Sequence, residues 1–276
     1  ERIVELLEIG QGSFRNASIA LARADSMMNA IDLSNVSQDF ILSLEQIRSY
    51  HRQISSIDSI LSASPQVLTT ILGVEEDTTY LVLAGNNDEI RPSSGYISTY
   101  GWLTVRNGRV TDFDFAPTST TNPKPPDSSF LDTFDIPQWW LNFQNPIYAA
   151  WEGSWHVDFP STAQLAMDYY NAGKNPNSPV DGVIALDIDS FALILQALGS
   201  INIPDSDLTL TADHLRQTIY NARIYGSLDH ERFLASIYRL IFEEWQNIDQ
   251  DQSTELITLL LEALTQHHIM IYLPGE

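Results

Sequence analysis

Residues 79–84 read TYLVLA, one threonine followed by five apolar residues. A run of this length and composition is typical of a strand that is buried on both faces, as the strands of parallel sheets are. A polar stretch follows at residues 85–95, and two further strands are predicted over residues 96–105 and 110–115, joined by an Asn-Gly hairpin turn. We therefore expect TYLVLA to be the central strand of an α/β domain.

The second half of the chain alternates predicted strands and helices. A helix capped by Ser161 precedes a strand over residues 182–186, a helix over residues 188–198 and a short strand over residues 201–203. This order is typical of a β-α-β unit with parallel strands. Three more helices and a last strand follow, the helices being capped by Thr211, beginning near Asp229 and covering residues 255–265, and the strand covering residues 269–273.

The first part of the chain predicts helices only. Apolar residues recur at helical spacing from Phe14 to Ile31 and again from Phe40 to Leu61, with turn and capping residues between them, which predicts an antiparallel helical hairpin. A Ser-Pro pair at Ser64 predicts the start of a short third helix that ends near residue 73. We thus expect a stalk or scaffold in residues 1–73 and an α/β domain in residues 74–276.

Composition restricts the partners of the chain. Its 36 acidic and 14 basic residues give a formal net charge of -22, so the mean field of the protein repels phosphates and nucleic acid is not expected to bind. A phosphate site would have to be a local arginine pocket. The absence of cysteine excludes disulfides and thiolate metal sites. No apolar run is long enough for a bilayer span, and the start at Glu1 led us to expect that an anchoring segment lies upstream.

Common catalytic signatures are absent from the sequence. It contains no Gly-x-Ser-x-Gly elbow, no His-Glu-x-x-His motif, no Walker lysine loop and no dinucleotide glycine fingerprint. His267 and His268 are adjacent at the start of a predicted strand, so their side chains are expected on opposite faces of the sheet, where they cannot share a metal. We expect a structural role for both, and no metal ligand is assigned.

The polar loop after the central strand is the first candidate site. Open α/β sheets tend to bind ligands at the carboxyl ends of their strands, and this loop contains Asn86, Asn87, Glu89 and Arg91. The two amides offer donors and acceptors, and the guanidinium of Arg91 offers a planar fork for a phosphate or carboxylate. The alternative is a solvated turn that the Asn and Asp side chains cap.

A second candidate region is rich in arginine. Arg232 and Arg239 are seven residues apart and so point the same way on one predicted helix. The region comprises Arg216, Arg223, Asp229, Arg232 and Arg239. Surface salt bridges are the alternative explanation for these arginines in an acidic protein.

Three segments together resemble the domain-of-unknown-function family 4012. They are YLVLAGNNDEIRPSSGYISTYGWLTVRNGRV from Tyr80, DGVIALDIDSFALILQALG from Asp181 and LTADHLRQTIYN from Leu210. The Asn-Asn-x-Glu-x-Arg element and the Asp-Gly-Val-Ile-Ala block are the specific parts of the resemblance. It implies a bacterial protein with an upstream transmembrane helix and the bulk of the chain outside the membrane, that is, an extracytoplasmic, membrane-anchored protein.

The order of elements is also similar, more remotely, to the LytR-CpsA-Psr enzymes, which move glycopolymers from a polyprenyl-pyrophosphate carrier to cell-wall glycan. Residues 81–87 look like their first strand and loop, residues 183–199 like a later strand and helix, and Arg223, Asp229 and Arg232 like their late arginine stretch. The resemblance implies a central mixed sheet flanked by helices. It also implies a magnesium ion at the pyrophosphate, but Asn87 and Ser94 or Gly95 stand at acidic metal positions, and amides bind magnesium more weakly.

Two functional hypotheses follow from these resemblances. In the first, an extracytoplasmic cell-envelope protein binds a polyprenyl-pyrophosphate-linked glycan and transfers it to a cell-wall acceptor. Its substrate-binding residues would be Asn86, Asn87, Arg91, Arg223 and Arg232, and its candidate bases Glu89 and Asp229. In the second, a non-catalytic envelope module binds glycan or protein through four tryptophans, namely Trp139, Trp140, Trp151 and Trp155.

Overall fold

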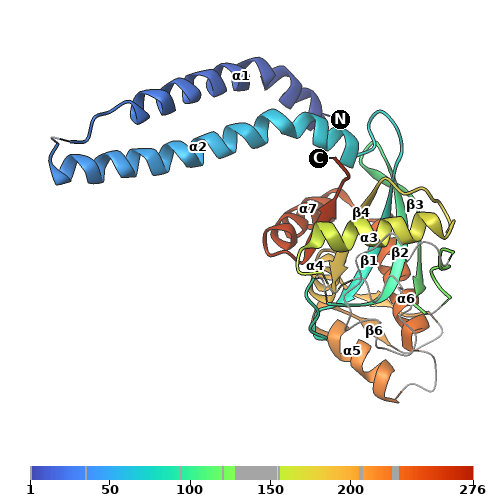
Figure 1. Cartoon of the computed structure of the whole chain (residues 1–276). Helices are drawn as coiled ribbons and strands as arrows, with labels where there is room; N and C mark the ends of the chain where they lie inside the picture. The colour runs from blue at the N-terminus through green and yellow to red at the C-terminus, as the bar shows by residue number, and fades with distance from the viewer. Residues whose placement is uncertain are drawn as a thin grey trace. The chain divides into compact units, whose positions relative to one another are not determined.

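The computed structural model describes residues 2–34, 36–93, 95–119, 121–127, 154, 156–204, 208–225 and 230–275. The chain forms two compact units (Figure 1). One, here called the helical unit, contains Glu1–Asp77 and Arg106–Arg109, and the other, here called the sheet unit, contains Thr78–Val105 and Val110–Glu276.

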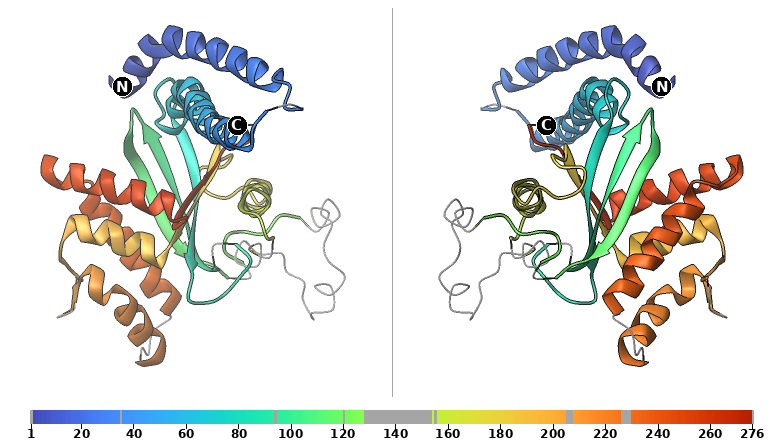
Figure 2. Two further views of the ribbon diagram at one scale, coloured as in Figure 1. Left: turned by 90° about the vertical axis from the view of Figure 1, so that its left-hand side faces the viewer. Right: turned by 90° about the vertical axis from the view of Figure 1, so that its right-hand side faces the viewer.

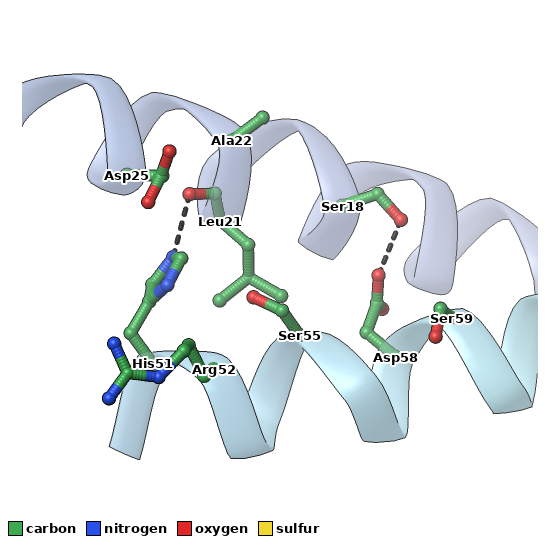
Figure 3. Close-up of a pocket in the computed structure, with 9 residues that line it drawn as sticks. All are labelled: Ser18, Leu21, Ala22, Asp25, His51, Arg52, Ser55, Asp58 and Ser59. Atoms are coloured by element: carbon green, nitrogen blue, oxygen red, sulfur yellow. Dashed lines mark hydrogen bonds between the residues drawn. The ribbon is translucent and has the colours of Figure 1, made fainter. Parts of the chain in front are cut away.

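The helical unit consists mainly of two long helices, α1 (Arg2–Asn29) and α2 (Gln38–Ile71). Ser37 caps α2 by accepting a hydrogen bond from the backbone N–H of Phe40. Side chains of α2 form hydrogen bonds to α1 at three points along the pair. The later a residue stands in α1, the earlier its partner stands in α2, so the two helices run antiparallel. Two of the pairs are Ser18 with Asp58 and the Leu21 carbonyl with His51 (Figure 3). The third is the Met28 carbonyl with Arg48.

The predicted short helix starting at Ser64 does not exist as a separate element. Helix α2 continues through Pro65 to Ile71 without a break. The Ser64 hydroxyl does not cap a new helix; it donates to the carbonyl of Ile60 within α2. The Ser-Pro pair was interpreted as a helix start because proline is favoured in the first turn, yet here Pro65 lies buried inside a continuous helix.

The sheet unit is built on a central mixed sheet, as predicted, and this sheet has five strands. Its strand order is β3-β2-β1-β4-β7. Strand β1 pairs parallel to β4 and antiparallel to β2, and β7 pairs antiparallel to β4. The strands are β1 (Thr78–Asn86), β2 (Tyr96–Arg106), β3 (Arg109–Pro117), β4 (Gly182–Asp187) and β7 (Ile269–Tyr272). The TYLVLA segment is therefore the central strand, and its last four residues are fully buried.

The strand register brings three chain segments to one edge of the sheet. Gly85 at the end of β1 lies opposite Asp187 at the end of β4, because the two strands are parallel and in step. Strand β7 runs the other way, and Ile269 at its start lies opposite Leu186. The residues after β1, after β4 and before β7 therefore meet at this edge, which positions the site described below.

Helices cover both faces of the sheet (Figure 2). Helix α3 (Phe159–Ala172) lies on one face, where Ala163, Ala166 and Tyr170 pack into a buried cluster with Leu81 and Leu83 of β1. The helices on the other face are α4 (Ile188–Leu198), α5 (Ala212–Tyr225), α6 (His230–Trp245) and α7 (Gln250–Thr265). Burial on both faces explains why β1 is apolar from Tyr80 to Ala84.

The predicted parallel β-α-β unit ending at residues 201–203 is wrong. Strand β5 (Ile201–Asn202) pairs antiparallel with β6 (Thr209–Leu210) in a separate two-stranded sheet. Helix α4 ends at Gly199, which has a positive φ of 84°, and the chain then turns back on itself. The parallel partner of β4 is β1, which lies about a hundred residues earlier in the chain and is out of reach of local pattern reasoning.

Two helix starts also differ from the sequence prediction. The cap of α3 is Asp158, whose side chain accepts from the backbone N–H of Ser161, the residue that the sequence had suggested as the cap. Helix α7 begins at Gln250, five residues before the predicted start. Its N-terminus is fixed by a capping box between Asp249 and Gln252.

A first prediction concerns the aromatic layer beneath α4 and α6. Phe115 is 1 % exposed and its ring contacts those of Phe191, Tyr238 and Phe242. Phe115→Ala leaves a cavity there and should lower the free energy of unfolding by about 3–5 kcal/mol in urea denaturation. The control Ile257→Ala truncates a side chain that is 60 % exposed and should cost much less; equal losses would contradict this packing.

Candidate metal-ion site

Two carboxylates stand at the junction of β4 and α4. Asp187 is the last residue of β4 and the cap of α4, because its Oδ1 accepts from the backbone N–H of Ser190 at 2.8 Å. Asp189 lies in the first turn of the same helix. The partial positive charge at a helix N-terminus stabilises both carboxylates.

Asn87 joins the two carboxylates from the end of β1. Its Nδ2 donates to Asp187 Oδ2 at 3.0 Å and to Asp189 Oδ2 at 2.6 Å. Its other terminal atom, Oδ1, is buried and has no hydrogen-bond partner. A buried acceptor without a partner costs free energy, so the amide is held in an arrangement that the protein alone does not satisfy fully.

His268 completes the cluster from the segment before β7. Its Nδ1 lies 2.7 Å from Asp187 Oδ2 and 3.9 Å from Asp189 Oδ2. His267 has a positive φ of 62°, and this left-handed residue turns the chain between α7 and β7. The two histidines therefore belong to a turn, and the strand alternation expected for them does not apply. The expectation of a purely structural role for His268 rested on that alternation.

An arginine of α5 holds the other side of the cluster. Arg216 forms ion pairs with Asp88 and, at 2.6 Å, with Asp189 Oδ1. Tyr220, one turn further along α5, donates its hydroxyl hydrogen to Asp88 Oδ2 at 2.9 Å. The second oxygen of Asp189 is thereby fixed toward Asn87 and His268, which orients the carboxylate.

Burial and hydrogen bonding move the two carboxylate pKa values in opposite directions. Burial raises the pKa of the Asp187 carboxyl, and hydrogen bonds from His268 and the Ser190 backbone offset only part of this effect. Burial acts in the same sense at Asp189, but hydrogen bonds from Asn87 and Arg216 outweigh it and lower the pKa of that carboxyl. The protein therefore favours charge at Asp189 and disfavours it at Asp187.

A cavity of about 420 Å³ opens beside the cluster. The positively charged side chain of Arg91 lines this cavity, and its guanidinium carbon lies 5.4 Å from the ring centre of Tyr96. Gly95, with a φ of 75°, allows the loop to close against the Asn86 carbonyl, which a Cβ would meet at 2.3 Å. The apolar part of the wall consists of Ile90, Val157, Phe159 and Met270, and its polar part includes Asn87, Asp187, Gln266 and His268.

The cluster fits a divalent cation. One ligand atom each from Asp187, Asp189 and His268 can be chosen so that all lie within 4.8 Å of one another. Metal bonds to these atoms measure about 2.0–2.2 Å, so two ligands of one ion lie at most about 4.4 Å apart. Both His268 distances satisfy this limit. Hydrogen bonds from Asn87 and His268 now join the two carboxylates, and the Asn87 bonds would have to open when a cation binds between the ligands.

The predicted loop residues divide between structural and site roles. Asn86 caps its own turn, since its Oδ1 accepts from the backbone N–H of Asp88, and its Nδ2 donates to Glu89 at 3.3 Å. Asn87 and Arg91 reach the cavity, and Glu89 is not among the described residues that line it. The solvated-turn explanation thus fits Asn86, whereas Asn87 and Arg91 line the cavity and stay predicted ligand-binding residues.

The predicted arginine region does not converge on the cavity within the described part of the chain. Arg232 is exposed on α6 and is not among the described residues that line the cavity. The side chain of Arg223 and the whole of Asp229 lie outside the described residues, as do Trp139, Trp140, Trp151 and Trp155. Arg239 pairs with Asp114, so the salt-bridge explanation holds for Arg239 as it does for Arg216.

The acidic residues at the centre of the site were missed by sequence reasoning. In the sequence, Asp187 and Asp189 belong to a segment that indicates only the family resemblance, and Arg216 is one of several arginines in its region. One signal was available: the Asp-Ile-Asp sequence follows directly on a predicted buried strand, as Asn87 does. Recognising it required knowing that β1 and β4 are parallel neighbours. For His268 the sequence offered no such signal.

A second prediction follows from the raised pKa of Asp187. Because the folded state disfavours ionised Asp187, Asp187→Asn should raise the free energy of unfolding of the metal-free protein at neutral pH, while asparagine still caps α4. The gain should shrink as the pH falls through the raised pKa, where Asp187 is itself neutral. Urea denaturation across this pH range measures it.

The control for this prediction is Asp251→Asn. It removes an exposed carboxylate from the N-terminal end of α7, whereas the site lies near the C-terminal end of that helix. It should not raise the free energy of unfolding, because Asp251 lies in a first helical turn where negative charge is favourable. A loss of stability in Asp187→Asn at neutral pH would show that the buried carboxylate is a net stabilising group, against this account.

A sequence model of the family described as "Protein of unknown function (DUF4012)" matches residues 75–223, more than half of the chain. The match confirms the resemblance drawn from the three sequence segments. It includes Asn87, Asp187, Asp189 and Arg216, and His268 lies beyond it. No curated protein matches the chain. Among the described helices, none has the length and apolar character to cross a membrane.

Proposed function

We propose that this chain, which belongs to the DUF4012 family, binds a divalent cation at Asp187, Asp189 and His268 and uses it to hold a phosphorylated ligand in the adjoining cavity. The observation that carries the proposal is the convergence of three separate chain segments on one pair of carboxylates at the mouth of a cavity. Ligand sites of α/β sheets lie at this edge.

The donor set indicates the kind of cation. Carboxylate oxygens are the ligands of Mg²⁺ and Mn²⁺, and an imidazole nitrogen favours the transition metal of these two. Asn87 Oδ1 adds a further oxygen ligand if the amide turns over, because Oδ1 then takes the place of Nδ2 beside the two carboxylates. We therefore assign Mn²⁺ or a similar first-row cation, with Mg²⁺ binding more weakly.

The charges around the cavity support a phosphate. The formal net charge of -22 repels anions, so a phosphate needs local positive charge. A bound cation supplies it on one wall and Arg91 on another, where its planar fork suits a phosphate. Magnesium-like ions are held in many proteins by one or two carboxylates together with substrate phosphates.

The apolar wall supports a ligand with a hydrocarbon part beside the phosphate. Ile90 and Val157 line the cavity and are 95 % and 86 % exposed, and Phe159 and Met270 lie near them. Exposed apolar side chains of this size can bind a hydrocarbon group, because the contact removes apolar surface of both partners from water. A polyprenyl pyrophosphate combines both features.

The finer part of the proposal comes from the remote resemblance to the LytR-CpsA-Psr enzymes. The chain would act at the extracytoplasmic side of a membrane to which an upstream segment anchors it, and its ligand would be a polyprenyl-pyrophosphate-linked glycan. An acceptor hydroxyl would form a bond to the phosphorus beside the glycan, the bridging phosphorus–oxygen bond would break, and polyprenyl phosphate would leave. The hydroxyl proton would pass to a carboxylate, for which Glu89 and Asp229 are the candidates named from the sequence.

A third prediction separates cation binding from phosphate binding. Calorimetry should show one saturable Mn²⁺ site in the intact chain, and binding of geranylgeranyl pyrophosphate that Mn²⁺ strengthens. Asp189→Asn should weaken Mn²⁺ at least about tenfold by removing a charged ligand. Arg91→Ala should leave Mn²⁺ affinity unchanged and weaken the pyrophosphate at least about tenfold.

The matched control is again Asp251→Asn, which makes the same change of charge away from the site and should bind both probes like the intact chain. If Mn²⁺ binds only weakly and equally well to all four proteins, the cation site does not exist. If Mn²⁺ binds as predicted but geranylgeranyl pyrophosphate does not bind, the cation site is confirmed and the proposed phosphate ligand is refuted. That result favours the non-catalytic envelope module.

A further inference from the structure

The pair of long helices in the helical unit has one face that no described residue of that unit covers. Contacts between the helices use Ser18, Leu21 and Met28 on α1. On α2 they use Arg48, His51 and Asp58. Each of these residues has a neighbour one position earlier in the sequence, and those neighbours form the uncovered face together with Ala24 and Ile54, which lie between them on the same helices.

The preceding positions of both helices lie on the same side of the pair. One residue corresponds to a rotation of about 100° about a helix axis. Since α1 and α2 are both right-handed and antiparallel, equal rotations about their axes lead to the same face of the two-helix layer. That face, here called the apolar face, carries Ala17, Ala20, Ala24 and Met27 from α1 and Ile47, Tyr50, Ile54 and Ile57 from α2.

The large side chains of the apolar face are exposed. Ile47, Tyr50, Ile54 and Ile57 are each more than half exposed, and Met27 is 65 % exposed. Their spacing on α2, alternately three and four residues, is the heptad pattern with which one helix packs against another. A set of apolar residues in this register is typical of a helix that has a second helical neighbour in addition to α1.

The opposite face of the pair is more polar, although Ile19, which follows Ser18, is exposed there. The positions that follow the contact residues include Ala22, Arg52 and Ser59, and these line a shallow groove together with Asp25 and Asp58 (Figure 3). The second half of α2 is also poor in charge on all its faces: from residue 53 to residue 72 the only charged side chain is Asp58, which is buried and accepts from Ser18. Depletion of charge marks the core of protein interfaces.

We infer that the apolar face is the interface of a homodimer, in which two copies of the helical unit pack face to face as a four-helix layer. From Phe40 to Ile60 the face is about 30 Å long and two helices about 20 Å wide, so a dimer buries about 1,200 Å², the lower end of stable interfaces. The alanines of α1 complement the isoleucines and Tyr50 of α2 when a second copy is turned by half a revolution, because small residues then face large ones.

A second copy suits this face better than a membrane does. Helices that lie on anionic membranes carry Lys and Arg on their polar side. Here the whole chain is strongly acidic, and an uncharged patch is the part of its surface where two copies can approach without charge repulsion. The heptad spacing also specifies a helical partner.

A fourth prediction tests this interface by sedimentation equilibrium of the 276-residue chain, whose monomer mass is 31.0 kDa. The intact chain should show twice this mass at micromolar concentration. Ile54→Glu combined with Ile57→Glu places two charges in the apolar face and should give monomers, with the dissociation constant raised at least about a hundredfold. Far-ultraviolet circular dichroism should show unchanged helix content, because both side chains are exposed.

The matched control is Ser56→Glu combined with Ser59→Glu, which adds the same two charges to exposed positions of the opposite face and should remain dimeric. An intact chain that stays monomeric, or a dimer that both double variants preserve, overturns the inference. A monomer that floats with phosphatidylglycerol vesicles, and loses this property with Ile54→Glu and Ile57→Glu, would assign the face to a membrane and so overturn it as well.

Discussion

The parallel pairing of β1 with β4 is the constraint on which the rest of the sheet unit depends. It joins segments about a hundred residues apart and requires both strands to be buried on both faces, which is why β1 is apolar from Tyr80 to Ala84. Because the pairing is in step from Tyr80 to Gly85, the polar residues that follow each strand come to the same edge. Asn87 and Asp187 can meet only in this register, since a shift by one residue would reverse every side chain.

The site at this edge combines local charge with burial in a way that does not serve stability. Asp187 is buried and its pKa is raised by that burial, while the acceptor oxygen of Asn87 is left without a partner. Arg216 neutralises Asp88 and Asp189 but faces them from the far side, so Asp187 depends on His268 and on Asn87. Unsatisfied groups of this kind cluster at functional sites, because the missing partner is supplied by the ligand.

Local sequence patterns predicted the elements well where periodicity was strong. The buried run at residues 79–84, the Asn-Gly hairpin and α4 all follow from spacing and turn chemistry. The predictions that were wrong depended on tertiary context. The short strand at Ile201 pairs with β6 and not with the central sheet, and Pro65 lies inside a helix that it was predicted to start. Part of the site could be predicted from the sequence, because Asn87 and Arg91 follow the central strand. Asp187 and His268 join them only through strand pairing and a left-handed turn at His267.

The central claim is that the edge of the sheet binds a divalent cation through Asp187, Asp189 and His268. It is tested most directly by a crystal structure of the chain grown with Mn²⁺, with anomalous scattering used to locate the metal. The account predicts an anomalous peak about 2.0–2.3 Å from a carboxylate oxygen of each aspartate and from Nδ1 of His268. A fully occupied Mn²⁺ elsewhere in the chain, with the hydrogen bonds of Asn87 and His268 to the carboxylates intact, would contradict it.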